Sequence, residues 1–293
     1  MSALTRVGRG LLFENIEWLG DQVTLFVIGL GEVTAMSFWC VVNFFSPPWR
    51  LDKLKEFLWQ CYDVAIKSLP IAVITAFFTG GVMALQLTYS LGRFGLKTYV
   101  GTMVSMSIVR ELAPVLTCLL VGSRVGSGMC AQIGSMTLTE QIDAMRSLGA
   151  DPLVKLVAPR VLACIVMFPV LTLLADVVGL WGGMVVTYQE AQLDPGFYWN
   201  SIKAYMWWED YAVGVFKTFF FGYAVAIIGC HQGLTVTGGA EGLGRATTFT
   251  VVMALIVILI SDYFLSKILL LWLIYGASAE QQAVNLLSGL GWG

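Results

Sequence analysis

Long stretches without charged residues are the feature that most constrains this chain. Residues 68–92 contain no charge, and residues 161–189 contain only one, Asp176. A helix of about 20 mostly apolar residues is long enough to cross the roughly 30 Å hydrocarbon core of a bilayer. Charged residues make up only 12% of the 293 residues, about half of the usual share in soluble domains. The sequence therefore predicts an integral membrane protein and excludes a soluble domain or a disordered chain.

Five runs have the length and composition of membrane-spanning helices. They cover residues 68–92, 98–123, 161–189, 218–240 and 246 to about 275. Strands of a membrane barrel would instead alternate over about 10 residues. We expect an all-α integral membrane protein with a single domain over 1–293, a five-helix core at 61–275 and an extracytoplasmic tail at 276–293.

The first 50 residues have a different pattern. Apolar residues recur at helical spacing among charges in 3–21, and the apolar stretch 22–49 contains Glu32 and ends at two prolines. We predict that residues 1–50 form an interfacial helix and a partly inserted or re-entrant hairpin, which together make an N-terminal elbow. The alternative is a sixth full span, which would place both chain ends on the same side of the membrane.

The lysines and arginines predict the orientation. If the first of five spans starts inside, ten of them lie in inner loops or near the N-terminus, and only Arg93, Lys97 and Lys203 lie in outer loops. Because inner loops carry the excess of positive charge, we expect a cytoplasmic N-terminus and an extracytoplasmic C-terminus. The aromatic loop 188–216 then lies outside.

Charge and metal-ligating residues exclude two further classes of protein. The formal net charge of −2 provides no basic surface for nucleic acid. The six cysteines lack C-x-x-C spacing and His231 is the only histidine, so we expect no metal site.

The polar segment 123–160 contains the pattern of a short capped helix. Thr137 and Glu140 have the spacing of a capping box, whereas Gly149 and Pro152 have the pattern of a helix end. We predict a helix at roughly 138–148, with a stripe formed by Leu138, Ile142 and Met145. Such an amphipathic helix lies on the membrane surface or docks into a groove of another protein.

Arg110 and Glu111 lie inside the second span, where charge is costly. Neighbouring residues on a helix point about 100° apart, so we expect each to have its own partner or a water-filled space. The candidate partners are the other embedded charges, Asp176, Lys217, Asp262 and Lys267. The residues alone leave open whether Glu111 lines a cavity or forms a buried pair.

A series of motifs resembles the MlaE/YrbE-type permeases. The motifs are Arg110-Glu111-Leu112-Ala113-Pro114, Gly122-Ser123-Arg124-Val125-Gly126-Ser127, Ala131-Gln132-Ile133-Gly134-Ser135-Met136, Thr139-Glu140-Gln141-Ile142-Asp143-Ala144, Gly149-Ala150-Asp151-Pro152, Pro159-Arg160 and Gly244-Arg245-Ala246-Thr247-Thr248. They occur in the family's order, and the resemblance covers about 60 to 265. The chain departs from the family at Gln132, where glutamate is frequent, and at Ala113, where glycine is common.

The resemblance implies a fold, a function and partners. It implies a homodimeric MlaE-like ABC permease of the bacterial inner membrane, with a periplasmic C-terminus, that moves phospholipid or a related hydrophobic molecule. The implied partners are a second copy, an ABC ATPase (MlaF-like) and a periplasmic Mce-domain protein (MlaD-like), with a STAS-domain protein (MlaB-like) left open. The chain has no Walker A motif, so we expect a non-catalytic subunit without a cofactor, and ATP bound by the partner.

The resemblance also implies roles for individual residues. The implied substrate-binding residues are Glu111, Met83, Leu87, Ser90, Leu91 and Phe94. The implied ATPase-coupling residues are Glu140, Gln141, Asp143, Ala144, Met145 and Leu148, and the implied structural charges are Arg110, Arg124 and Arg245. The helical spacing of the apolar residues in the first set indicates by itself only packing against another helix. Alternative functions are a channel or scaffold without transport, and an intramembrane enzyme that uses Glu111, Asp176 or Asp262.

Overall fold

The computed structural model describes Gly31 and residues 51–289, with side chains at Gly31 and from 54 to 272. The chain divides into two compact units, Met1–Pro48 and Trp49–Gly293. The predicted N-terminal elbow at 1–50 lies outside the described residues except for Gly31. The architecture below is that of the second unit.

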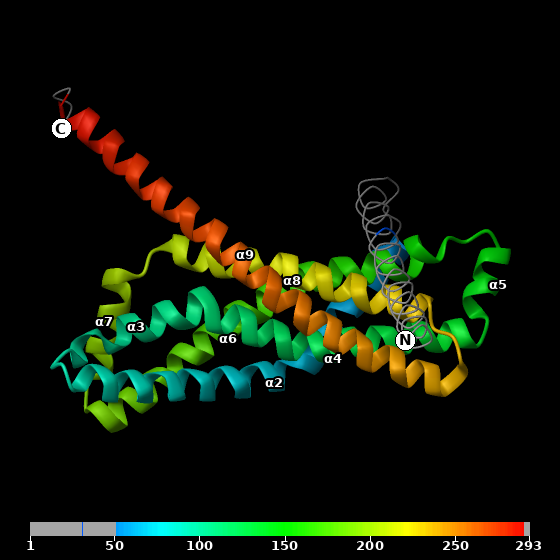
Figure 1. Ribbon diagram of the computed structural model, residues 1–293, viewed down its shortest axis with the longest axis horizontal. Helices are drawn as coiled ribbons and strands as arrows, with labels where there is room; N and C mark the ends of the chain where they lie inside the picture. The colour runs from blue at the N-terminus through cyan, green and yellow to red at the C-terminus, as the bar shows by residue number, and fades with distance from the viewer. Residues whose placement is uncertain (1–30, 32–50, 290–293) are drawn as a thin grey trace, which may run out of the picture. The chain divides into compact units, whose positions relative to one another are not determined.

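The second unit is a bundle of long helices (Figure 1). Its described elements are α2 (Leu51–Gly92), η1 (Lys97–Tyr99), α3 (Val100–Ser107), η2 (Ile108–Leu112), α4 (Ala113–Leu138), α5 (Gln141–Ser147), η3 (Leu153–Val157), α6 (Ala158–Ala191), α7 (Pro195–Tyr205), α8 (Trp208–Leu234) and α9 (Gly239–Gly289). Five segments of it have the length and composition of membrane spans: Leu54–Gly92, Lys97–Leu138, Leu153–Ala191, Trp208–Leu234 and Gly239–Trp272. The expected all-α membrane fold with five spans is confirmed, and no strand occurs among the elements that the structure describes.

The helices extend well beyond several of the predicted spans: α2 begins at Leu51 and not at 68, and α4 ends at Leu138 and not at 123. The fourth span is α8, which begins at Trp208 and not at 218, and α9 begins at Gly239 and not at 246. A carboxylate oxygen of Asp210 accepts a hydrogen bond from the Trp207 backbone N–H at 3.0 Å and so caps the start of α8. The uncharged run begins only after Lys217, whereas the helix includes Lys217 and starts at Trp208. The connection between α6 and α8 therefore holds α7 and is shorter than the predicted loop 188–216.

Glycines let α6 pack closely against α2. A Cβ atom on Gly80 would overlap the carbonyl oxygen of Gly179, and one on Gly182 would overlap the carbonyl oxygen of Phe77. The two helix backbones are therefore in direct contact, as small residues permit in membrane proteins. In α4, a Cβ on Gly126 would lie 3.2 Å from the Val225 side chain of α8, so the G-x-x-x-G pattern at 122–126 serves packing within the chain.

The replacement of Gly80 by alanine should destabilise the bundle. The added methyl group meets a backbone carbonyl that cannot move aside without displacing α6, and we expect a loss of about 1–3 kcal/mol. Gly128→Ala is the matched control, because a Cβ there meets nothing within 4 Å. Thermal unfolding of both variants in detergent checks the prediction. Equal midpoints for Gly80→Ala and wild type would contradict the close helix contact.

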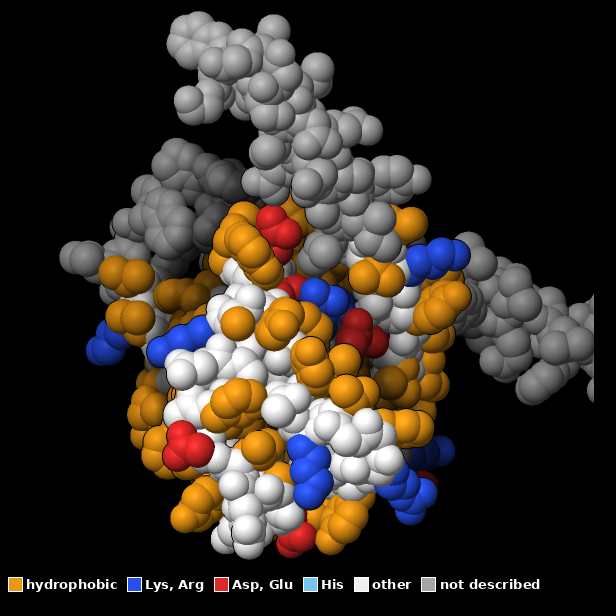
Figure 2. Space-filling model, turned by 90° about the vertical axis from the view of Figure 1, so that its left-hand side faces the viewer, with side chains coloured by type: hydrophobic (Ala, Val, Ile, Leu, Met, Phe, Trp, Pro, Cys, Tyr) orange, Lys and Arg blue, Asp and Glu red, His pale blue; other side chains and the backbone are white. Residues whose placement is uncertain are grey.

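Helix α7 lies at the end of the bundle where α2 turns into α3 (Figure 1). Asp194 caps it by accepting hydrogen bonds from the backbone N–H groups of Gly196 at 2.8 Å and Phe197 at 3.2 Å. Tyr198 anchors the helix, because its side chain is buried and its hydroxyl donates to the Leu180 carbonyl at 3.3 Å. Burial also raises the pKa of this phenol. Figure 2 shows that charged and hydrophobic side chains are interspersed on this end.

Candidate functional site

An irregular turn in the middle of the second span positions the site. The element η2 (Ile108–Leu112) is π-helical, and the Ala113 N–H bonds to the Ile108 carbonyl five residues earlier. In a regular α-helix the carbonyl of Arg110 would accept from residue 114, but Pro114 has no N–H. Lys217 of α8 donates to this carbonyl, with its Nζ 3.0 Å from the Arg110 oxygen.

Lys217 is the centre of a charged cluster inside the bundle. Its side chain is fully buried, and its Nζ lies 2.8 Å from Glu111 Oε2, 3.3 Å from Asp262 Oδ1 and 2.6 Å from Ser266 Oγ. We call Lys217, Glu111, Asp262 and Ser266 the lysine cluster. It joins η2, α8 and α9 with two carboxylates around one ammonium group, and 47% of the Glu111 side chain is exposed.

Arg110 forms a separate pair beside the lysine cluster. Its Nε and Nη2 donate to Asp210 Oδ1 at 2.8 and 2.5 Å, and the Asp210 side chain is buried. Arg110 and Glu111 therefore have different partners. Lys217 is among the partners expected from the sequence, but Asp210 is not, because it lies in the stretch 188–216 predicted as a loop. Ser266 is not among them either, and its signal is its position four residues after Asp262 on the same helix.

The predicted substrate residues of α2 do not gather around Glu111 within the described chain. Leu87 and Leu91 are half-buried against the core formed with α3, α6 and α7, Met83 is half-buried, and Ser90 and Phe94 are exposed. Glu111 instead points toward α8 and α9. A hollow between α2, α4 and α6 is lined by Thr75, Ala76, Thr79, Gly80, Ile108, Leu112, Ala113, Leu116, Thr117 and Ala175, and by none of the six predicted residues.

The short helix predicted at 138–148 is present as α5, Gln141–Ser147, but the predicted capping box is wrong. Thr137 Oγ1 donates backward to the carbonyls of Ile133 and Gly233, both at 3.0 Å, so α4 continues to Leu138. Glu140, with φ +58°, then makes the corner before α5 and forms no side-chain cap.

The predicted end of this helix is confirmed. Gly149 has φ +74°, its N–H bonds to the Arg146 carbonyl at 2.9 Å, and the Ala150 N–H bonds to the Met145 carbonyl at 3.1 Å. These two bonds make a Schellman motif. Asp151 then accepts from the Leu153 N–H at 2.9 Å, and the next helical segment begins there.

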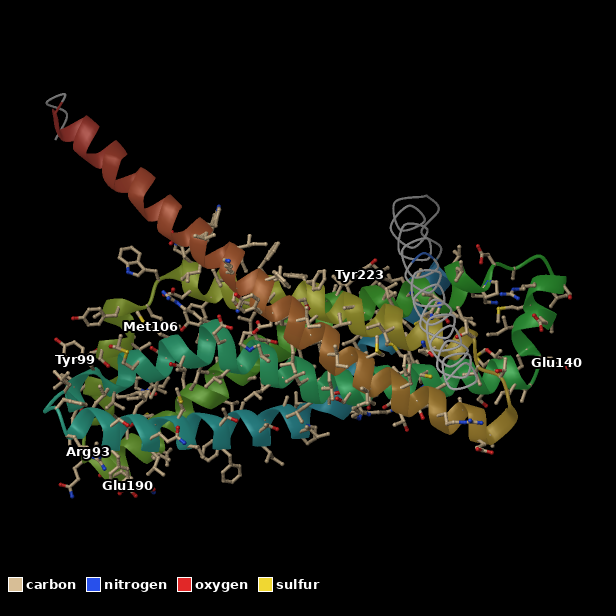
Figure 3. All side chains as sticks on the ribbon, in the orientation of Figure 1. Arg93, Tyr99, Met106, Glu140, Glu190 and Tyr223 are labelled. Carbon is tan, nitrogen blue, oxygen red and sulfur yellow. The ribbon has the colours of Figure 1, made fainter. Side chains whose placement is uncertain are left out.

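Helix α5 has an inner and an outer face. Ile142 is buried and Met145 is half-buried, so the predicted apolar stripe holds α5 to the bundle. The other five of the predicted coupling residues, Glu140, Gln141, Asp143, Ala144 and Leu148, are exposed, and Leu148 is 85% exposed. Figure 3 shows Glu140 at the end of the bundle opposite to Arg93 and Glu190.

The two remaining arginines predicted as structural charges have different surroundings. Arg124 Nη1 donates to Ser68 Oγ of α2 at 2.8 Å, which ties α4 to α2. Arg245 lies 3.5 Å from Glu241, but both side chains are at least three-quarters exposed. Such a surface pair contributes little to stability.

Five apolar spans that enclose ion pairs define a helical integral membrane protein as the class of this chain. The chain belongs to the MlaE permease family, whose model, described as "Permease MlaE", matches residues 57–268. This confirms the resemblance seen in the sequence motifs.

Relatives in several organisms agree with this assignment. A probable ABC transporter permease protein of Synechocystis is 42% identical over 221 residues, which are 75% of this chain and 82% of that protein. The intermembrane phospholipid transport system permease protein MlaE of Haemophilus influenzae is 34% identical over 260 residues, which are 88% of this chain and 98% of that protein. The chloroplastic TRIGALACTOSYLDIACYLGLYCEROL 1 protein of Arabidopsis thaliana is 35% identical over 201 residues, which are 69% of this chain and 57% of that protein.

Proposed function

We propose that the chain is the permease subunit of an ABC transporter that moves phospholipid between the bacterial inner membrane and a periplasmic Mce-domain protein (MlaD-like). The family match over 57–268 carries this proposal, together with the phospholipid transport permease named among its relatives. A separate ABC ATPase (MlaF-like) hydrolyses ATP, so this subunit is non-catalytic and needs no cofactor. A STAS-domain protein (MlaB-like) is a further candidate partner.

The charges inside the bundle support a substrate with apolar tails and a polar head. The lysine cluster places a half-exposed carboxylate, that of Glu111, in a membrane span, and embedded ionisable residues of this kind mark substrate pathways in membrane proteins. An apolar bundle with a polar group at its edge suits a lipid better than a small ion.

The outward faces of α2 support a second copy as partner. Ile74, Phe78 and Val82 are 60%, 65% and 53% exposed on the described chain. In the proposed homodimer, Ser90 and Phe94 of α2 face the substrate between the two copies. The N-terminus and α5 are cytoplasmic and the C-terminus is periplasmic in this proposal.

The lipid content of the purified protein tests the proposed function. We expect phospholipid to co-purify with the wild type, and Ser90→Trp to reduce the bound amount several-fold, because a large side chain fills the space that an acyl chain needs. Val177→Trp, at a 59% exposed position of α6, is the control that should retain lipid. Mass spectrometry of the intact assembly measures both variants.

Two outcomes of this measurement contradict different parts of the proposal. A wild-type protein without phospholipid would contradict the substrate class and favour a channel or scaffold. Full lipid occupancy in Ser90→Trp would contradict the position of the site on α2.

A further inference from the structure

Asp176 is a buried carboxyl group for which the described residues offer no hydrogen-bond partner. It lies in the middle of α6 and is 1% exposed, and both of its side-chain oxygens are unpaired within the described part of the chain. Few buried polar atoms in proteins lack a partner. Asp176 belongs neither to the Arg110–Asp210 pair nor to the lysine cluster, so neither accounts for a buried carboxyl group at this position.

An ionised carboxylate at this position would carry a large desolvation cost without compensation. The elements packed against α6 at this level include α8 and η2, and their charged and titratable groups there are Tyr211 and Asp210 of α8 and Arg110 and Glu111 of η2. The facing stretch of α2, residues 68–92, has no charged residue. Since both charged groups of η2 are bound to other partners, the neutral carboxyl is the form that this environment stabilises.

The packing of α6 places Asp176 at the same level as the Arg110–Asp210 pair. A Cβ on Gly183 would lie 3.0 Å from Val104, and one on Gly179 would lie 3.3 Å from Ile108. The next turn in this antiparallel register brings Asp176 beside η2. Tyr211, which follows Asp210 on α8, lies close enough to both carboxyl groups for their charge to influence its ionisation.

Arg110 has the freedom to change partners. Its hydrogen bonds to Asp210 use Nε and Nη2 and reach only one carboxylate oxygen, Oδ1. Its side chain is 29% exposed, whereas that of Asp210 is 3% exposed. A guanidinium group has five N–H donors, so further donors are free to bind a second carboxylate.

We propose that Asp176 is a proton-binding site and the second acceptor for the Arg110 guanidinium. In the described arrangement Asp176 holds a proton and Arg110 binds the Asp210 carboxylate. In the other arrangement Arg110 binds the Asp176 carboxylate, and the proton that Asp176 releases is held by Asp210.

The exchange conserves charge within the bundle, because one proton moves from one carboxyl group to the other. It gives α6 and α8 two discrete pairings, as a conformational switch in a transporter requires. The inference does not depend on the identity of the substrate.

Infrared spectroscopy of the full-length chain in lipid nanodiscs tests this proposal. A protonated carboxyl group has a C=O stretching band that an ionised carboxylate lacks. The difference between wild type and Asp176→Asn should contain this band, with Asp176→Leu as a second reference. An ionised-carboxylate signal in this difference would overturn the proposal.

The switch itself is tested in the background of Asp210→Asn, which cannot hold Arg110 by charge. There Arg110 should move to Asp176, so the protonated band should disappear from the spectrum. Asp262→Asn is the control and should leave the band in place. A protonated band that persists in Asp210→Asn would overturn the exchange.

The folding of these variants gives a second readout. Asp210→Asn should remain folded, because the Asp176 carboxylate then pairs with the Arg110 guanidinium. Asp176→Asn should also remain folded, because asparagine resembles the neutral carboxyl group. The double variant should lose far more thermal stability than the two losses added together. Additive losses, or an Asp210→Asn protein that does not fold, would overturn the second acceptor role.

Discussion

Replacement of Lys217 by methionine should destabilise the protein by about 3–5 kcal/mol and abolish lipid transport. The exchange removes a fully buried ammonium group and leaves the carboxylates of Glu111 and Asp262 without a counter-charge inside the bundle. It also removes the donor to the Arg110 carbonyl that Pro114 cannot serve. Removing one partner of a buried ion pair lowers the free energy of unfolding by about this amount, because the other partner remains as a desolvated charge without a counter-ion. Thermal unfolding in detergent and the yield of folded protein measure the effect.

Two companion variants separate charge from packing in this prediction. Lys267→Met removes an exposed lysine on the same helix as Asp262 and should leave stability unchanged. The triple variant Lys217→Met, Glu111→Gln, Asp262→Asn removes all three charges and should recover most of the lost stability. A triple variant as unstable as Lys217→Met would show that the ion pairs are not the cause.

Replacement of Leu148 by aspartate should weaken binding of the ATPase strongly while the permease stays folded. Leu148 is 85% exposed at the end of α5, and Asp143 and Ala144 are exposed on the same short helix. If α5 docks into the ATPase, Leu148 is buried in the complex, and an aspartate there would place a carboxylate in an apolar contact. We expect a loss of about 2 kcal/mol, or roughly a 30-fold weaker complex. Co-purification of the ATPase and its stimulated hydrolysis rate are the measurements.

The matched control introduces the same substitution at the other end of the bundle. Leu96→Asp lies in the turn between α2 and α3, at a position that is 44% exposed. It should bind the ATPase like wild type. If Leu148→Asp retained full binding and stimulation, α5 would not be the coupling helix.

The five spans could be predicted from the sequence because each depends on a local property, a long run of apolar residues. The end of α5 was predictable for the same reason, since only residues near Gly149 take part in its turn. The ion pairs were only partly predictable. Lys217 was recognised as embedded, but its simultaneous contacts to η2 and α9 depend on how three helices pack.

Errors arose where a local pattern competed with distant contacts. Thr137 and Glu140 match a capping box, yet the hydroxyl of Thr137 bonds to the Gly233 carbonyl, 96 residues away in the chain. Asp210 lies in the predicted loop 188–216, because the apolar run of the fourth span begins only at 218, although Asp210 caps α8 and binds Arg110. Pro114 offered a signal that was missed, because a proline four residues after Arg110 leaves that carbonyl without its usual donor.

The transfer of phospholipid by the reconstituted complex is the most direct test of the central claim. The permease and its ATPase are placed in proteoliposomes that contain a fluorescent phospholipid, and transfer to the Mce-domain protein is followed with and without ATP. We predict ATP-dependent transfer in the wild type and none with Leu148→Asp, while Leu96→Asp transfers lipid normally. Transfer at the same rate without ATP, or full transfer by Leu148→Asp, would contradict the account of a permease driven through α5.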